Sequence, residues 1–148
     1  MTQTLTLTPE EVSVIEHIAL GHTTTQIAAD LGTTRAGAKQ RIVCLVRVTG
    51  SGNRGGLVGT AYRQGWLHSL PTEPRDAPIP LTGRRLDCIT LASYGMTDRQ
   101  IAAQLRVSEN TVGTHLRRAF RALGARRREH AVALAYQHRY LPRTRGTR

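Results

Sequence analysis

The side chains best suited to chemistry in this sequence are arginines that recur at helical spacing. Arg117, Arg118 and Arg121 follow Gly113 and Thr114 at positions that place all five residues on one face of a helix. A guanidinium can bond a guanine edge in two places or pair with a phosphate, and a threonine methyl can contact thymine. This face therefore indicates contact with a nucleic acid rather than catalysis.

No catalytic or metal-binding motif is present. The sequence lacks a nucleophile elbow and an HExxH pair, and the glycines at 50–56 lack the Lys-Ser/Thr that a phosphate-binding loop requires. His17 and His22, five residues apart, do not share a helical face and have no cysteine or carboxylate at ligand spacing. We expect no enzymatic activity, no metal, no cofactor and no small-molecule ligand.

The composition is that of a basic, folded protein. The 148 residues include 21 Lys plus Arg against 10 Asp plus Glu, and the net charge is +11. Such a charge attracts polyanions, of which nucleic acid is the commonest, and 39% hydrophobic residues argue against general disorder. With neither a signal sequence nor a long apolar run, we expect no membrane contact and a cytoplasmic, nucleoid-associated bacterial protein.

The sequence contains an internal repeat. Residues 7–67 align with residues 81–141 without a gap at a constant offset of 74, and about 17 of the 61 pairs are identical. The intervening residues, 68–80, contain four prolines and no apolar periodicity. We predict an N-terminal domain at 1–67, a proline-rich linker at 68–80, a C-terminal domain at 81–141 and a basic tail at 142–148.

Each repeat is expected to form four helices and no strand, so the predicted fold class is all-α. Thr8 precedes a first helix with Pro9 at its start and Glu11 at the capping-box position. Thr23 and Thr97 are each followed three residues later by glutamine, which predicts a short second helix.

A longer third helix follows a tight turn in each repeat. Thr34 or Ser108 is its expected cap, and a fourth helix is expected at roughly 57–64 and 129–138. A short helix, a turn and a longer capped helix form the helix-turn-helix pattern, whose second helix enters the major groove.

Residues 81–141 resemble the LuxR/GerE-type DNA-binding domain over their whole length. They contain its threonine-capped first helix, glycine, Ile-Ala-x-x-Leu helix, Ser-Glu-x-Thr-Val-x-x-His segment and alanine-rich last helix. The first repeat is divergent, with residues 34–38 in place of Ser-Glu-x-Thr-Val and a glycine-rich segment at 51–56. Arg106 also departs from the repeat, because it occupies the turn position where Gly32 stands in the first copy.

The resemblance implies base-reading positions at Gly113, Thr114 and Arg117. Lys39, Gln40 and Val43 are their equivalents in the first repeat, where lysine can bond guanine and glutamine can bond adenine. The residues expected to bind phosphates are hydroxyl-bearing or basic and lie on or near the third helices: Ser108, Thr111, His115, Arg118, Arg121, Arg126, Arg127, Arg128, Arg41 and Arg47.

These features predict a sequence-specific regulator of transcription that binds double-stranded DNA. About seven residues precede the first repeat, so no sensor domain is expected. A 13-residue extended linker spans up to roughly 40 Å, enough to let one chain occupy two half-sites, direct or inverted. The alternative is a homodimer, since the resemblance implies pairing through the last helix, whose apolar residues are Ala131, Val132, Leu134 and Ala135.

Two other functions remain open at this point. One is a protein resembling region 4 of a sigma factor, which docks on RNA polymerase or on an anti-sigma partner. The other is a phage or plasmid protein that organises, replicates or partitions DNA without regulating a promoter.

Overall fold

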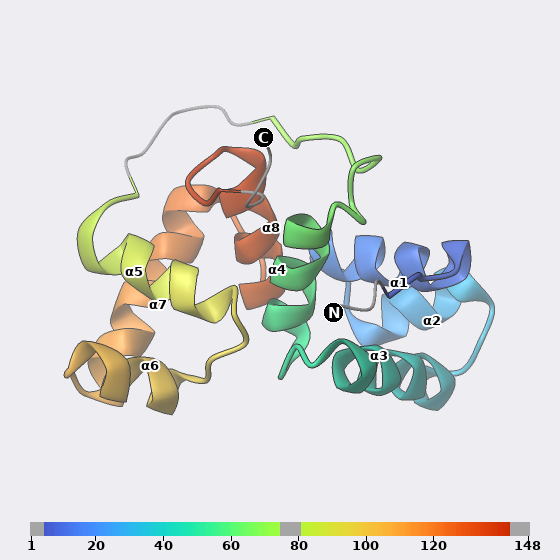
Figure 1. The fold of residues 1–148 in the computed structure, drawn as a ribbon, viewed down its shortest axis with the longest axis horizontal. Helices are drawn as coiled ribbons and strands as arrows, with labels where there is room; N and C mark the ends of the chain where they lie inside the picture. The colour runs from blue at the N-terminus through green and yellow to red at the C-terminus, as the bar shows by residue number, and fades with distance from the viewer. Residues whose placement is uncertain (1–4, 75–80, 143–148) are drawn as a thin grey trace.

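The computed structural model describes residues 5–74 and 81–142, and over these residues the protein is entirely helical. The eight helices are α1 (Pro9–Ala19), α2 (Thr24–Leu31), α3 (Arg35–Thr49), α4 (Arg54–Gln64), α5 (Gly83–Ala92), α6 (Asp98–Leu105), α7 (Glu109–Leu123) and α8 (Arg128–Gln137). The predicted all-α class is confirmed. Figure 1 shows α4 and α8 side by side at the centre, with α1–α3 on one side and α5–α7 on the other.

The two sets of four helices follow the same spacing along the chain. The bounds of α2 and α6, and those of α3 and α7, differ by the repeat offset of 74 residues. In the described residues, a short helix followed by a turn and a longer helix therefore occurs twice. Residues 75–80 of the predicted linker and residues 143–148 of the predicted tail lie outside the described residues.

Threonine and serine side chains begin most of these helices as expected. Thr8, Thr23 and Thr97 each form a complete capping box with the acidic or amide side chain three residues later. Thr82 occupies the same position before α5, but its side chain makes no capping hydrogen bond. The first helix of the second set is thus the less firmly capped of the two.

The fourth helices begin earlier than the sequence predicted. The first begins at Arg54 rather than near Leu57, because the Asn53 side chain accepts the Gly56 N–H at 2.9 Å and caps it. The second runs from Arg128 to Gln137, one residue earlier at each end. Glycines disfavour helices, which is why the predicted helix excludes the glycine-rich segment at 51–56.

The buried residues form one hydrophobic cluster that runs through both sets of helices. Close approach is possible because α4 carries glycines where it meets the second set. A Cβ at Gly59 would overlap the Ser93 carbonyl oxygen, and one at Gly56 would lie 2.7 Å from the Gly95 Cα. Tyr62 of α4 and Tyr136 of α8 are buried in this contact. The two sets therefore pack as one body.

The described part of the predicted linker lies against α8. The Glu73 N–H donates to the Gln137 Oε1 at 2.9 Å, and the Glu73 carboxylate lies 3.0 Å from the His130 Nε2. None of the helices in residues 5–74 and 81–142 combines the length and the apolar content needed to cross a bilayer.

Candidate nucleic-acid interface

The α6–α7 unit of the second set forms a tight helix-turn-helix. Helix α6 ends at Arg106, which adopts the left-handed conformation with φ 60°. Ser108 then caps α7 by accepting the Thr111 N–H at 3.0 Å. Gly32 adopts the same conformation between α2 and α3. The left-handed conformation costs Arg106 about 1 to 2 kcal/mol of backbone strain, whereas a glycine adopts it without this strain.

Three predicted base-reading residues lie together on α7. Arg117 is exposed, and its Nη2 donates to the Thr114 Oγ1 at 3.2 Å. A Cβ at Gly113 would lie 3.3 Å from the Arg117 Nη1, so the missing side chain gives the guanidinium room along the helix. The Arg117 guanidinium and the Thr114 hydroxyl thus present hydrogen-bonding atoms on one accessible face, as direct readout of bases in a groove requires.

Beside this face lies a cluster of arginines that we call the arginine cluster: Arg85, Arg118 and Arg121. Together with Ala122 they line a shallow cavity of about 180 Å³. Among the described residues no carboxylate lines this cavity, so its three guanidinium groups suit a phosphate. Sequence reasoning found Arg118 and Arg121 but missed Arg85, which comes from α5 and meets them only in the folded chain.

The polar residues at the start of α7 serve its structure first. The hydroxyls of Ser108 and Thr111 lie 2.8 Å apart, and Ser108 is exposed at the positive end of the helix. The Nδ1 atom of His115 is buried and has no hydrogen-bond partner in the described part of the chain. That nitrogen is closed to a phosphate, which leaves Nε2 as the ring atom that could meet one.

The arginines between α7 and α8 all have partners within the chain. Arg126 donates to the Leu20 carbonyl oxygen at the end of α1. Arg128 donates to the Asp98 carboxylate at 2.9 Å, and Arg127 lies 3.5 Å from the Glu129 carboxylate. The sequence predicts that these arginines bind phosphates. The structure gives Arg126 and Arg128 a positioning role, because they tie the start of α8 to α1 and α6.

The corresponding face of α3 is less basic. Lys39, Gln40, Val43 and Arg47 are all exposed, so the predicted first-repeat positions are accessible. Arg41 is engaged, since its Nη1 donates to the Glu10 carboxylate of α1 at 2.8 Å.

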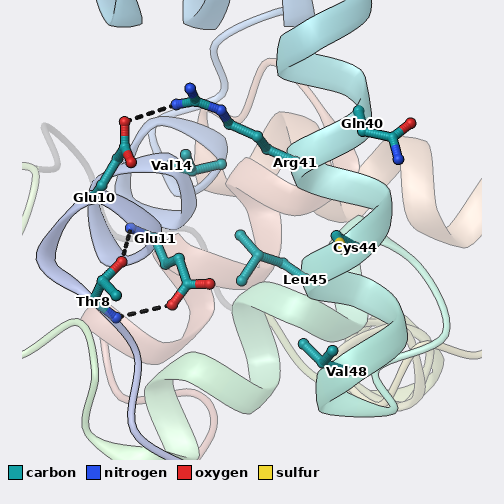
Figure 2. Close-up of a pocket in the computed structure, with 9 residues that line it drawn as sticks. All are labelled: Thr8, Glu10, Glu11, Val14, Gln40, Arg41, Cys44, Leu45 and Val48. Carbon is teal, nitrogen blue, oxygen red and sulfur yellow. Dashed lines mark hydrogen bonds and ion pairs between the residues drawn. The ribbon is translucent and has the colours of Figure 1, made fainter.

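A cavity of about 450 Å³ opens between this helix and the start of α1. Figure 2 shows Glu10 and Glu11 on its α1 side, and Gln40, Cys44 and Val48 on α3. At the offset of 74, Arg84 and Arg85 replace the two glutamates in the second set. The first set therefore presents carboxylates where the second presents guanidinium groups, and its face suits phosphate less well.

The residues predicted to form a homodimer are not at the surface. Ala131, Val132, Leu134 and Ala135 are at most 3% exposed, because α8 packs on α4 and α1 of the same chain. The expectation that this face pairs with a second copy is therefore wrong. The apolar face of α8 does form a packing interface, but it packs against α4 and α1 of the same chain.

His130 is the one buried histidine of the α4–α8 region. Its Nδ1 accepts the Arg126 N–H at 3.0 Å, so the neutral ring carries its proton on Nε2 and donates it to Glu73. Burial lowers the pKa of His130, and the nearby Glu73 carboxylate opposes that shift.

The structure also corrects the interpretation of His17 and His22. Their Nδ1 atoms lie 3.0 Å apart, and the Asp30 carboxylate lies beside both. Gly21, with φ 84°, reverses the chain after α1 and brings His22 back over His17. Sequence spacing along a straight helix could not have shown this.

Comparison with known proteins places the second set in a recognised class. The model of bacterial regulatory proteins of the luxR family matches residues 79–135. Residues 79–135 thus comprise one LuxR/GerE-type helix-turn-helix domain, of which the described part begins at residue 81.

Curated relatives are similar to less than half of the chain. The response regulator RamR of Streptomyces coelicolor is 42% identical over 60 residues, which are 40% of this chain and 30% of RamR. The transcriptional activator protein BjaR1 of Bradyrhizobium diazoefficiens is 41% identical over 70 residues, 47% of this chain and 29% of that protein. The nitrate/nitrite response regulator protein NarP of Escherichia coli is 41% identical over 59 residues, 40% of this chain and 27% of NarP.

The chain thus spans less than a third of the length of these relatives. No solved structure gives a significant match to it.

Proposed function

We propose that this protein is a sequence-specific regulator of transcription that binds double-stranded DNA through α7 and α3. The observation that carries the proposal is the exposed Arg117–Thr114 face of α7 inside a LuxR/GerE-type domain, next to the arginine cluster. Arg117 and Thr114 read bases, and Arg85, Arg118 and Arg121 hold phosphates. Base contacts then supply specificity and phosphate contacts supply affinity and register.

The first set of helices acts as a second, weaker reader in this proposal. Lys39, Gln40 and Val43 are accessible on α3, but Glu10 and Glu11 reduce the attraction of that face for phosphate. The two sets are tandem copies of one domain, joined by residues 68–80. The common helix spacing and the matching capping boxes support this reading.

The contact between α4 and α8 favours inverted half-sites over direct ones. Gln137 donates to the Tyr62 hydroxyl at 2.8 Å, and Arg63 donates to the Tyr136 hydroxyl at 2.8 Å. Gln137 follows Tyr136 in the chain and bonds Tyr62, whereas Arg63 follows Tyr62 and bonds Tyr136. Such reciprocal contacts are expected of a two-fold interface. A two-fold relation between α3 and α7 matches a pseudo-palindromic site.

One observation favours a protein partner for the first set. Helix α3 exposes Val43 and Val48, and Val48 lines the same cavity as Glu10 and Glu11, so this surface also suits a protein partner. The alternative of docking on RNA polymerase or an anti-sigma partner therefore draws its support from α3 and not from α7.

Selection of bound sequences from a random duplex pool at about 150 mM salt tests the proposal. The full chain should enrich two inverted half-sites at fixed spacing. The double variant Lys39→Ala and Gln40→Ala should lose preference in one half-site only, and Arg117→Ala should lose it in the other. Arg139→Ala, which removes one charge beyond α8, is the matched control and should leave the enriched sequence unchanged.

Three outcomes would overturn parts of the proposal. A single half-site, unaffected by the α3 variant, would make α3 a protein-binding surface. No enrichment, combined with capture of RNA polymerase in the absence of DNA, would favour the sigma-like alternative. Enriched sites that cluster at a replication origin rather than upstream of genes would favour a DNA-organising or partition protein.

A further inference from the structure

Three potential metal ligands meet where α1 turns into α2. His17 lies in the last turn of α1, His22 lies in the turn and Asp30 lies on α2. The His17 Nδ1 and His22 Nδ1 atoms are 3.0 Å apart, and the Asp30 Oδ2 is 3.5 Å from the first and 3.9 Å from the second. We propose that these three side chains bind a divalent first-row transition-metal ion, with Zn²⁺ as the probe.

The separations agree with a tetrahedral coordination sphere. With ligand atoms at 2.0 to 2.2 Å from zinc, two ligands of a tetrahedral site lie about 3.3 Å apart. The three observed separations lie on both sides of that value. Two imidazoles and one carboxylate form a nitrogen and oxygen donor set, which suits zinc, cobalt, nickel and copper better than magnesium or calcium.

The site is accessible to an ion from solvent. The side chains of His17 and His22 are 23% and 29% exposed, and that of Asp30 is 50% exposed. Three protein ligands leave a fourth position for water or an added ligand. Two arginines near the site are engaged elsewhere: Arg126 donates to the Leu20 carbonyl oxygen, and Arg54 donates to the Thr24 hydroxyl at 2.6 Å.

The corresponding turn of the second set has the same backbone but none of the three potential ligands. At the offset of 74, Leu91, Met96 and Gln104 replace His17, His22 and Asp30. The turn is the same in both, because the His22 N–H donates to the His17 carbonyl at 3.1 Å and the Met96 N–H donates to the Leu91 carbonyl at 3.3 Å. Leu91 and Met96 pack against the core there. Where the second set has apolar side chains that pack against the core, the first set has potential metal ligands that lie close together.

A bound ion would tie α1 to α2, the first helix of the α2–α3 pair. In its absence the two imidazoles are held by one hydrogen bond between their Nδ1 atoms, in which one ring donates and the other accepts. Coordination replaces that single bond with three bonds to one centre, so the ion stabilises the folded chain over the unfolded one.

Calorimetric titration of Zn²⁺ into the chelator-washed full-length protein tests the proposal, with thermal unfolding as the second readout. The expected result is one tightly bound Zn²⁺ per chain and a Tm that rises with zinc. Because loss of even an outer-shell partner of a metal costs about 10- to 100-fold in affinity, His17→Leu and His22→Met should each weaken binding by more than about 100-fold. Both variants should also abolish the rise in Tm.

The variants are chosen so that failure to fold does not obscure the result. Leucine and methionine occupy the same backbone positions in the second set, and Asp30→Asn keeps the shape of the third ligand. His68→Gln, which changes an exposed histidine outside the cluster, is the matched control and should bind zinc as the parent does. The proposal is overturned if the parent binds no zinc, or if the His17 and His22 variants bind it as tightly as the parent. The measurement contains no DNA, so its outcome is independent of the proposed function.

Discussion

Tyr62 and Tyr136 stand 74 residues apart in the sequence and stack on each other in the fold. Their ring centroids are 5.2 Å apart, and their planes are inclined by 8°. Two positions separated by the offset of 74 are therefore in direct contact, as happens at the axis of a two-fold dimer. In this protein both partners of that contact belong to one chain.

The tyrosine pair should be a major source of stability. Tyr136→Ala is expected to lower the free energy of unfolding by about 3 to 5 kcal/mol, because it removes a buried aromatic ring. Tyr136→Phe keeps the stack and loses the hydrogen bond from Arg63, so it should cost about 1 kcal/mol. Urea unfolding followed by circular dichroism measures both changes. Equal effects of the two substitutions would show that the ring stack contributes little.

The same unfolding curves report whether the two sets of helices are independent. The core is continuous between them, so a single cooperative transition is expected. Two separate transitions in the parent protein would contradict the shared core.

His130 should make stability depend on pH. Burial lowers its pKa in the folded state, so between that value and the unfolded value of about 6.5 the unfolded chain binds more protons. The free energy of unfolding should then fall as the pH drops below about 6.5. His130→Gln should remove this part of the slope, and His68→Gln, an exposed control, should retain it. A slope unchanged by His130→Gln would refute the assignment.

Arg117 and Arg121 should contribute differently to DNA binding. Arg117→Ala is expected to cost about 1 to 3 kcal/mol on the preferred sequence and to relax the preference at one base pair. Arg121→Ala should weaken binding to all sequences alike and reduce the salt dependence by about one unit of log–log slope. Binding isotherms on matched and substituted duplexes at several salt concentrations distinguish the two. Identical behaviour of the two variants would show that the assigned roles are wrong.

The carboxylates beside α3 should limit the first reader. Glu10→Arg introduces the residue type found at Arg84 and also releases Arg41 from its ion pair. The salt dependence of DNA binding should steepen by about one to two units of log–log slope, since two guanidinium groups become available to phosphates. Glu16→Arg, a change of the same charge on α1 away from the cavity, is the control. A slope that does not change in Glu10→Arg would indicate that α3 does not approach DNA.

Local signals in the sequence predicted most of the helices. Threonine and serine caps and apolar periodicity predicted α1–α3 and α5–α7, because caps and periodicity depend only on residues that are close in the sequence. The start of α4 was missed because Gly55 and Gly56 indicate a loop, whereas the fold needs a glycine at 56 to let Gly95 approach.

Contacts between distant segments could not be predicted in the same way. The alanine-rich face of α8 signalled an interface but not its partner, and the sequence could not distinguish α4 of the same chain from a second copy. The pairing of Arg128 with Asp98 and the meeting of His17 with Asp30 depend on how helices turn and pack. Residue types and spacing alone carry no such information.

The proposed function depends most on one chain supplying both DNA-reading helices, α3 and α7. The direct measurement is the mass of the complex, by analytical ultracentrifugation, with a duplex that carries the two selected half-sites. One chain per duplex is predicted, because the apolar faces of α4 and α8 are buried against each other within a single chain. Two chains bound together on the same duplex, with one half-site each, would contradict the account.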